Sequence, residues 1–397
     1  MIDAAASLQS GKSDAQPESA RDALHIEVFA AQDIALAKYA QLCADGVFAP
    51  AQSLLWVRNW IIHAKPDALF AAIIVNDRPV FALALEVVRS GPFRIARFMG
   101  GSHANGNFPA MQRSLKASIA IREVISAIHA ARPDVDAILL ERVATTLDGV
   151  ENPLLALPHM PSPNLALAVE LDGGFDAVLE RSAAKHLAKR YRRQQRKFNA
   201  AGGAHRIVAR SPQEVTGIFN AFLDMKAARF GELGVADVFE DSDIRAFFQA
   251  LFVDALEEPR PSFVLHGLKV GDRLCAVTGT SVCGQRLICE FGSIASTGVP
   301  GSSPGEYLFF DNIREACEAG YRVYDFSVGD EPYKRSWCNI ETHHVDIVLP
   351  LTTKGHILTA ATRLAARLKA FVKGNPAMWG LIKTVRRRTA GAAVRND

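Results

Sequence analysis

The sequence of 397 residues lacks the cysteine pairs, metal-ligand spacings and short catalytic motifs that identify several classes of protein. It has only six cysteines and none of them forms a C-x-x-C pair, so we expect reduced cysteines and no disulfide framework. Histidine and cysteine do not recur at metal-ligand spacing, and neither a G-x-S-x-G nor a Walker motif is present. These absences disfavour metal-dependent, serine-hydrolase and nucleotide-hydrolysing chemistry, and no metal is expected.

Long apolar runs are also missing. The best candidate, residues 69–88, is interrupted by Asn76-Asp77-Arg78-Pro79 and predicts a hairpin rather than a membrane span. The first residues lack the basic start and apolar core of a signal peptide, and residues 1–23 have the composition of a disordered tail. We therefore expect a cytoplasmic protein without a transmembrane segment. A net charge of +3 is too small to indicate nucleic-acid binding by itself.

What the sequence does contain is one order of predicted elements that occurs twice. Short Gly-containing turns separate three strand-like segments in the second half, and a helix and a strand follow them. These elements are residues 263–270, 273–283, 286–294, 304–319 and 321–328. The first half repeats the order with residues 69–75, 80–88, 94–99, 114–131 and 137–143. Many α+β domains share this order, but its repetition favours tandem domains of one fold.

The predicted organisation is a domain at 24–163 and a second at 164–352, which begins with a strand near residue 164. Helices at 353–388 and a tail at 389–397 follow. The length and the 49% of apolar residues suffice for two buried cores. We predict an α/β (α+β) fold with central mixed, mainly antiparallel sheets flanked by helices.

The stretch 303–337 is the most informative part of the chain. Ser303 as N-cap, Pro304 at the first position and Glu306 three residues after the cap predict the start of a helix. Gly320 ends that helix, a strand follows, and Gly329 opens a polar loop, 330–337. Acid, base and phenol side chains gathered after a strand are typical of an α/β active site. The first half has no counterpart to this loop, so the chemistry is expected in the second half.

These residues resemble a known family. The Ser-Pro-Gly-x-x-Leu helix start at 303–308, the strand with Asp325-Phe326 and the segment Gly-Asp-Glu-Pro-Tyr-Lys-x-x-Trp at 329–337 carry the resemblance. They are similar to the acetyltransferase domain of CelD-like cellulose-biosynthesis proteins, within the GNAT superfamily. The layout is also similar to Fem-type aminoacyltransferases, which contain two GNAT-like domains. The resemblance extends over most of residues 25–355.

The resemblance implies acyl-CoA as co-substrate, bound where a loop meets a helix N-terminus that favours phosphate. The implied cofactor-binding residues are Gly298, Gly301, Ser303, Gly305 and Glu306. This loop departs from the usual GNAT signature, because no lysine or arginine occurs between Arg286 and Arg314. The alternative is a plain connection into a capped helix.

The resemblance also implies catalytic residues. Tyr333 is the candidate general acid for the leaving thiolate, and Lys334 could bind acceptor or phosphate. Glu290 lies in an apolar strand, where burial would make it a general base, although alternation equally allows it to face water. The candidate substrate-binding residues are Asp330, Glu331, Arg335, Trp337 and Arg193. Against these roles, a charge cluster of this kind is often a solvated turn.

Residues 181–197 contain eight cations and no acid, with apolar residues at helical spacing. Such a basic amphipathic helix can bind phosphates, RNA or a peripheral membrane surface, and it could supply the charge that the loop at 298–305 lacks. The alternative is a solvated helix face. His103, Asn105 and Asn107 in a Gly-rich loop are further candidates for substrate binding.

The expected function is therefore acetyl or acyl transfer from acyl-CoA to an amine or hydroxyl of a small-molecule, glycan or peptide acceptor. The resemblance links it to cell-envelope or exopolysaccharide metabolism. Two alternatives stay open: a Fem-like enzyme that uses aminoacyl-tRNA, and a non-catalytic binding protein on a GNAT scaffold.

Overall fold

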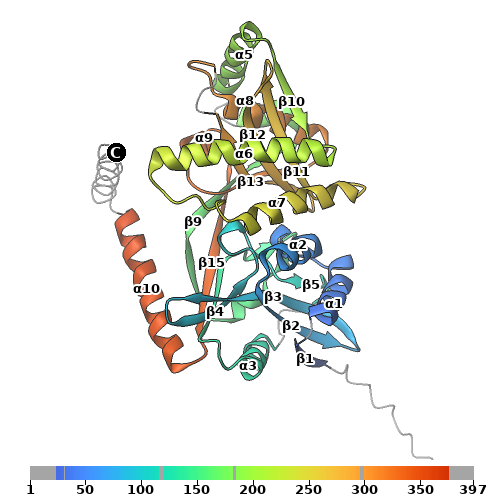
Figure 1. The fold of residues 1–397 in the computed structure, drawn as a ribbon, viewed down its shortest axis with the longest axis vertical. Helices are drawn as coiled ribbons and strands as arrows, with labels where there is room; N and C mark the ends of the chain where they lie inside the picture. Colours follow the sequence, from blue (N-terminus) through green and yellow to red (C-terminus); the bar gives the residue numbers. More distant parts are fainter. Residues whose placement is uncertain (1–23, 31, 116–119, 182–184, 296–298, 375–397) are drawn as a thin grey trace, which may run out of the picture.

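The computed structural model describes residues 24–30, 32–115, 120–181, 185–295 and 299–374 (Figure 1). The first half comprises β1 (Leu24–Phe29), α1 (Gln32–Asp45), α2 (Leu54–Ala64), β2 (Asp67–Val75), β3 (Arg78–Ser90), β4 (Phe93–Phe98), β5 (Ala110–Met111), α3 (Ile121–Ala131), β6 (Ala137–Val143), β7 (Thr146–Leu147) and β8 (Val150–Glu151). Short 3-10 turns lie at Pro50–Gln52, Gly101–His103 and Pro153–Ala156.

The second half begins with β9 (His159–Glu170) and contains the longer helices. Its further elements are α4 (Gly174–Arg181), α5 (Lys185–Ala200), β10 (Ala204–Val208), α6 (Pro212–Leu233), α7 (Ser242–Asp254), a 3-10 turn (Ala255–Glu257), β11 (Phe263–Val270), β12 (Arg273–Cys283), β13 (Arg286–Ile294), α8 (Pro304–Glu318), β14 (Val323–Val328), α9 (Pro332–Arg335), β15 (Ile340–Pro350) and α10 (Thr353–Gly374). None of these described helices is long and apolar enough to cross a bilayer.

Local sequence signals explain several of these elements. Asn76 and Asp77 both have positive φ, as a tight turn between β2 and β3 requires. Gly271 and Gly284 adopt the same left-handed conformation in the turns of the β11–β12–β13 meander. The Oγ of Ser211 accepts a hydrogen bond from the Glu214 amide and so caps α6.

Within the described part of the chain, one mixed sheet of thirteen strands runs through both halves, in the order β1-β2-β3-β4-β6-β15-β9-β14-β13-β12-β11-β10, with β5 paired to β3. Most neighbours are antiparallel, and the exceptions are β4 with β6 and β13 with β14, which are parallel. The late strand β15 lies between β6 of the first half and β9, pairing with both. The predicted boundary at 163/164 falls inside β9. The mixed α/β fold with a largely antiparallel sheet flanked by helices is confirmed.

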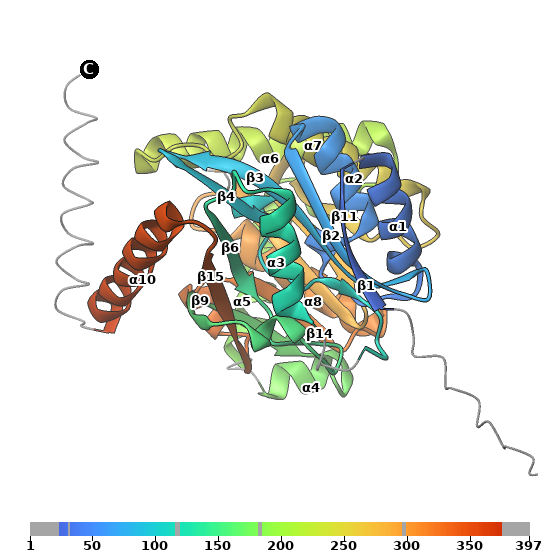
Figure 2. The same cartoon turned by 90° about the horizontal axis from the view of Figure 1, so that it is seen from below.

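The helices cover the sheet on two faces (Figures 1 and 2). Along β2, alternate residues point to opposite faces, so Phe70 and Ile74 belong to the core cluster that also contains buried residues of α1, α2, α6 and α7. The intervening Ala71 and Ile73 pack with α3. In the second half, α4, α5 and α8 pack over β13 and β14. The layer of α2 and α7 joins the halves, and Trp56 meets Phe247 edge-on at 4.9 Å between ring centroids.

Four local predictions need correction. The helix expected at 114–131 is found as α3 from Ile121, since residues 114, 115 and 120 are not helical and 116–119 lie outside the described part. The strand expected near 164 begins at His159, because it extends along β15. The polar loop at 330–337 contains a short helix, α9, with Pro332 at its first position. The predicted capping box before α8 does not form: the Ser303 side chain makes no capping hydrogen bond, and Glu306 instead pairs with Arg190 of α5 at 2.6 Å.

Candidate active site

The site lies where β13 and β14 separate. These parallel strands pair only over Arg286–Ile288 and Val323–Asp325, although β13 continues to Ile294 and β14 to Val328. Beyond the paired residues lies a cavity of about 650 Å³, which we call the gap cavity. Its lining comes from β12, β13, β14, α6, α8 and α9.

The equivalent gap of the first half is filled by the chain itself. There β4 and β6 pair over two residues only. The Asn107 amide donates to the Arg142 carbonyl at 2.9 Å, and the Ala144 amide donates to the Asn107 carbonyl at 2.8 Å. The loop thus adds a strand-like segment against the end of β6, and Phe108 beside it is fully buried. The gap between the parallel strands is therefore filled in the first half and open in the second.

Glu290 lies at a β-bulge at the edge of the gap. Gly279 of β12 pairs with Phe291 of β13, and the next residue, Thr280, pairs with Cys289. Glu290 is therefore the extra residue of β13, without a partner in the ladder. The hydroxyl of Ser281 donates to its Oε1 at 2.5 Å, and Nδ2 of Asn105 donates to its Oε2 at 2.8 Å. Burial raises the pKa of Glu290, and these two hydrogen bonds oppose the rise. A carboxylate that is fixed in place and has a raised pKa is suited to accept a proton.

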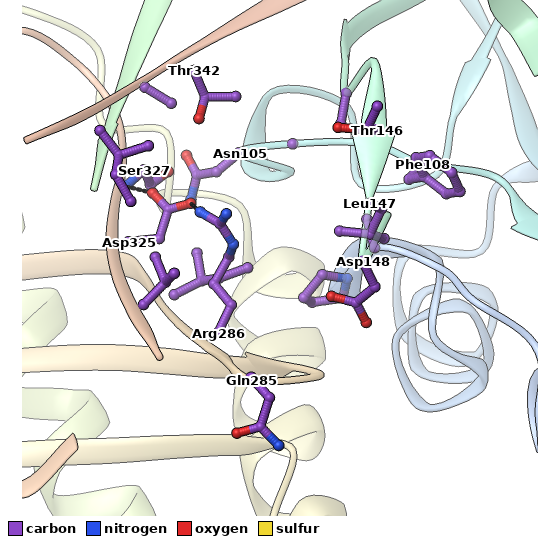
Figure 3. Close-up of a pocket in the computed structure, with 18 of the residues that line it drawn as sticks. Asn105, Phe108, Thr146, Leu147, Asp148, Gln285, Arg286, Asp325, Ser327 and Thr342 are labelled. Atoms are coloured by element: carbon purple, nitrogen blue, oxygen red, sulfur yellow. Dashed lines mark hydrogen bonds and ion pairs between the residues drawn. The ribbon is translucent and has the colours of Figure 1, made fainter. Parts of the chain in front are cut away.

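A second cavity, of about 430 Å³, lies between the halves, and we call it the inter-half cavity (Figure 3). Asn105 reaches it from the first half, while Arg286 and Asp325 face it from the second and form an ion pair at 2.7 Å. Glu290, Asn105 and Ser327 line both cavities. These three side chains therefore separate the two spaces, and a group in either space can meet Glu290.

Among the described residues that line the inter-half cavity, two buried side-chain polar atoms have no hydrogen-bond partner. They are Ser327 Oγ and His344 Nδ1, whose residues are 7% and 8% exposed. The backbone of Ser327 is left-handed, with φ 64, which is costly for a residue with a side chain. Its amide donates to Asp325 Oδ1 at 2.7 Å, which holds this conformation. Unsatisfied buried polar atoms beside a cavity are available for a ligand.

Tyr333 and Lys334 both line the gap cavity. Tyr333 stacks on Phe309, with 5.5 Å between ring centroids, and burial raises its pKa well above the usual value. It therefore keeps its proton at neutral pH. The ammonium of Lys334 is buried, donates to the Val328 carbonyl at 2.8 Å and pairs with Glu331 at 3.0 Å. Lys334 ties α9 to the end of β14 at the cavity wall.

The other residues of the 330–337 segment have different positions. Glu331 lines the gap cavity beside Lys334. Arg335 is on the surface, where it pairs with Asp330 at 2.5 Å and with Glu341. Trp337 is buried and packs against Phe310, with ring centroids 5.8 Å apart. Asp330, Arg335 and Trp337 are not among the described residues that line the two cavities.

The basic helix reaches the loop before α8. Lys197 of α5 donates from Nζ to the Gly301 carbonyl, and Gln194 accepts a hydrogen bond from the Ser303 amide at 3.2 Å. Arg190, one turn earlier, pairs with Glu306 at the start of α8. Of the predicted basic helix, 181–197, Arg181 is the last described residue of α4 and Lys185 the first of α5, while residues 182–184 lie outside the described part. Two cations of α5 thus stand beside a loop that contains none.

Three of the predicted cofactor-binding residues, Ser303, Gly305 and Glu306, line the gap cavity. Gly301 has φ 61 and lies beside Lys197, and Gly298 is outside the described residues. A Cβ at Gly305 would lie 2.8 Å from Ile294 Cγ2, so a larger residue here would force the exposed Ile294 side chain at the end of β13 to shift. Arg193 is exposed on α5 and is not among the residues that line either cavity.

Sequence reasoning missed two cations of the gap cavity, Lys226 and Arg229 of α6. Lys226 Nζ lies 5.7 Å and 5.5 Å from the ring centroids of Phe222 and Phe230, and burial lowers its pKa. The spacing of one helical turn places both cations on one face of α6, but nothing local shows that this face meets β13. Of the Gly-rich loop, Asn105 is at the site, whereas His103 packs among aromatic rings with its pKa lowered to about 4 by burial.

Comparison with known proteins agrees with this geometry. Residues 185–335 match the family model described as "Acetyltransferase (GNAT) domain". The solved structure of FemX shares 11% identity at a TM-score of 0.55, over 81% of this chain and 97% of that chain. Residues 185–335 are therefore similar to a GNAT acetyltransferase domain, and the chain has a fold of the GNAT type.

Two further structures cover most of the chain. A tandem GNAT protein from the clavulanic acid biosynthesis pathway shares 13% identity at a TM-score of 0.47, over 83% of this chain and 99% of that chain. L-PGS from Bacillus licheniformis shares 10% identity at a TM-score of 0.48, over 83% and 91%. No curated protein matches the chain in sequence.

Proposed function

We propose that the second half transfers an acyl group, acetyl in the first instance, from acyl-CoA to an amine or hydroxyl acceptor. The observation that carries the proposal is the position of Glu290, a carboxylate with a raised pKa that lines both cavities. Direct transfer needs the two substrates to meet beside one proton acceptor. The gap cavity would hold the donor and the inter-half cavity the acceptor.

The residues of the gap cavity suit acyl-CoA. The first amides of α8 lack intrahelical partners and form an anion site. Pro304 carries no N–H, so the donors at this end are the Gly305 and Glu306 amides, and Gly305 allows the close approach to β13. Lys226 and Arg229 face the cavity from α6, and Lys197 stands at the loop. Phosphate groups would thus meet positive charge that comes from other helices.

The co-substrate supplies a thioester, an acyl group already activated for attack. Glu290 accepts the proton of the attacking amine or hydroxyl, with Ser281 and Asn105 holding its carboxylate in place. As the new bond to the acyl carbon forms, the C–S bond breaks and the sulfur leaves as a thiolate. Tyr333, protonated at neutral pH, is positioned on the cavity wall to return a proton to that sulfur.

The inter-half cavity favours a polar acceptor. Ser327 Oγ and His344 Nδ1 are ready for hydrogen bonds, and Arg286 and Asp325 neutralise each other. An amine that also carries hydroxyl or amide groups would satisfy both orphaned atoms. The resemblance to CelD-like proteins supports a glycan or another cell-envelope acceptor, and a peptide would fit the same hydrogen-bonding groups.

A second candidate function is aminoacyl transfer from aminoacyl-tRNA. The observation that favours it is α5, where Arg192, Arg193 and Arg196 are exposed beside the loop that Lys197 contacts. The phosphates of a tRNA backbone would pair with these three cations. The gap cavity itself favours acyl-CoA, because its cations are gathered at one place and CoA carries only a few phosphate groups close together.

Thermal-shift titration separates these functions. Acetyl-CoA should raise the melting temperature of the protein, because a ligand that binds the folded state stabilises it by about 2.7 kcal/mol at one hundred times its Kd. A response to aminoacyl-tRNA with none to millimolar acetyl-CoA would select the second function. No response to either donor would leave a non-catalytic binding protein.

A further inference from the structure

The C-terminal helix α10 has two different faces. It runs along the outer edge of the molecule beside β15 (Figures 1 and 2). Its inner face is tightly packed: Gly355 and Thr359 are buried, and a Cβ at Gly355 would lie 1.9 Å from the Asp136 carbonyl oxygen. Arg363 donates to the Val348 carbonyl of β15 at 3.1 Å. These contacts fix which side of α10 faces outward.

The outward side carries an apolar stripe of Ile357, Leu364 and Leu368. Their spacings of seven and four residues place the three side chains on one helix face, opposite Gly355 and Thr359. They are 66%, 59% and 57% exposed, the highest values among large apolar side chains of the described residues. Three such side chains in one row form a contiguous apolar patch, unlike apolar residues that are exposed singly.

The charge of the chain is concentrated in the same region. Ten of the 45 lysines and arginines lie within residues 347–396, and none of the 42 acids does. Five of these cations belong to α10, namely Lys354, Arg363, Arg367, Lys369 and Lys373. The remainder of the chain is net negative, because the whole carries only +3. Lys354 and Arg363 donate hydrogen bonds to the Pro92 and Val348 carbonyls, so they also help to hold α10 against the rest of the protein. An exposed apolar helix face within a segment that has many cations and no acid is typical of helices that lie in an anionic membrane surface.

The other basic helix, α5, does not share this pattern. Its large apolar side chains Leu187 and Phe198 are buried, and Tyr191 stacks on Phe310 with 4.0 Å between ring centroids. It therefore offers charge without an apolar face. A membrane contact, which the sequence suggested for residues 181–197, fits α10 better.

We propose that α10 docks the protein on anionic phospholipid bilayers, with Ile357, Leu364 and Leu368 in the headgroup boundary and the net positive charge of residues 347–396 attracting anionic lipid. A second copy of this chain is a poorer occupant of the stripe. Pairing two α10 helices would bring ten cations together without one acid, which is unfavourable. This proposal is independent of the donor and acceptor that the enzyme uses.

The test is co-sedimentation of the full chain with vesicles of phosphatidylcholine containing 30% phosphatidylglycerol, alongside vesicles of phosphatidylcholine alone. The wild type should pellet with the anionic vesicles at least tenfold more strongly, and less so at high salt. The double variant Leu364→Gln with Leu368→Gln should lose at least tenfold in binding. The matched control, Ile34→Gln with Ile62→Gln, removes two apolar side chains that are each 53% exposed on α1 and α2, and should bind as the wild type.

Melting temperatures check that both double variants fold, since all four side chains are exposed. Equal binding of the wild type to both vesicle types, or none to either, would overturn the proposal. So would anionic-vesicle binding that the stripe variant retains in full. Light scattering that shows a dimer of the wild type and a monomer of the stripe variant would assign the stripe to a second copy instead.

Discussion

Replacing Glu290 with glutamine removes the proposed proton acceptor while keeping the shape of the side chain. The amide oxygen can still accept a hydrogen bond from Ser281, whose hydroxyl lies 2.5 Å from Oε1. General-base catalysis typically contributes about 10²- to 10⁴-fold in rate. We therefore expect kcat to fall by at least a hundredfold, with little change in affinity for acetyl-CoA.

The pH dependence of this effect has a definite sign. Burial raises the pKa of Glu290, and the base must be deprotonated to act. Wild-type kcat should therefore fall as pH drops through this raised pKa, and the glutamine variant should lack that limb.

The free energy of unfolding should depend on pH in the direction opposite to kcat. Because the folded carboxyl has the higher pKa, the folded protein binds this proton more tightly than the unfolded chain does. The free energy of unfolding therefore falls as pH rises from the unfolded pKa of Glu290 to its folded pKa, by about 1.4 kcal/mol per unit of difference. Glu290→Gln removes the titrating group, so the free energy of unfolding of the variant should lack this fall with pH.

The assay is spectrophotometric release of thiol from acetyl-CoA with the best acceptor of an amine and amino-sugar panel, followed from pH 5 to 9. Asp172→Asn is the control: this carboxylate also lines the inter-half cavity but pairs with Arg322 at 3.0 Å. A Glu290→Gln variant with more than a tenth of wild-type kcat, or with an unchanged acidic limb, would refute the role of Glu290.

Three further variants test the surrounding residues. Tyr333→Phe should lower kcat at least tenfold without weakening acetyl-CoA binding in calorimetry; equal turnover would remove Tyr333 as the acid. Lys226→Gln combined with Arg229→Gln should raise the Kd for acetyl-CoA about tenfold, which is about 1.4 kcal/mol, and an unchanged Kd would place the phosphates elsewhere. Trp337→Ala should lower the free energy of unfolding by about 3–5 kcal/mol in denaturant titration, and a loss below 1 kcal/mol would contradict its burial.

Local features of the fold were predictable from the sequence. The strands β11, β12 and β13 match their predicted bounds, because two-residue turns at Gly271 and Gly284 act within a few residues of the chain. The insertion of β15 between β6 and β9 was not predictable, since pairing between residues that are far apart in the chain leaves no local pattern. The repeated order of elements was visible in the sequence, whereas the position of β15 in the sheet, where it joins the two halves, was not.

At the candidate site, too, local features were predictable from the sequence and contacts between distant residues were not. The sequence placed Tyr333 and Lys334 near the chemistry, and both line the gap cavity. For Glu290 it left burial and exposure equally open, because strand alternation depends on register and a bulge at Glu290 resets it. Asn105 donates to Glu290 from 185 residues away, a contact that only the packing of the halves creates.

The claim that the donor occupies the gap between β13 and β14 is tested most directly by hydrogen–deuterium exchange with and without acetyl-CoA. We predict protection of residues 290–294 and 301–306, with β4 and β6 of the first half unchanged, because Asn107 and its neighbours already fill the corresponding gap there. Protection of the first-half strands without protection of 290–294, or no protection at saturating acetyl-CoA, would contradict the claim.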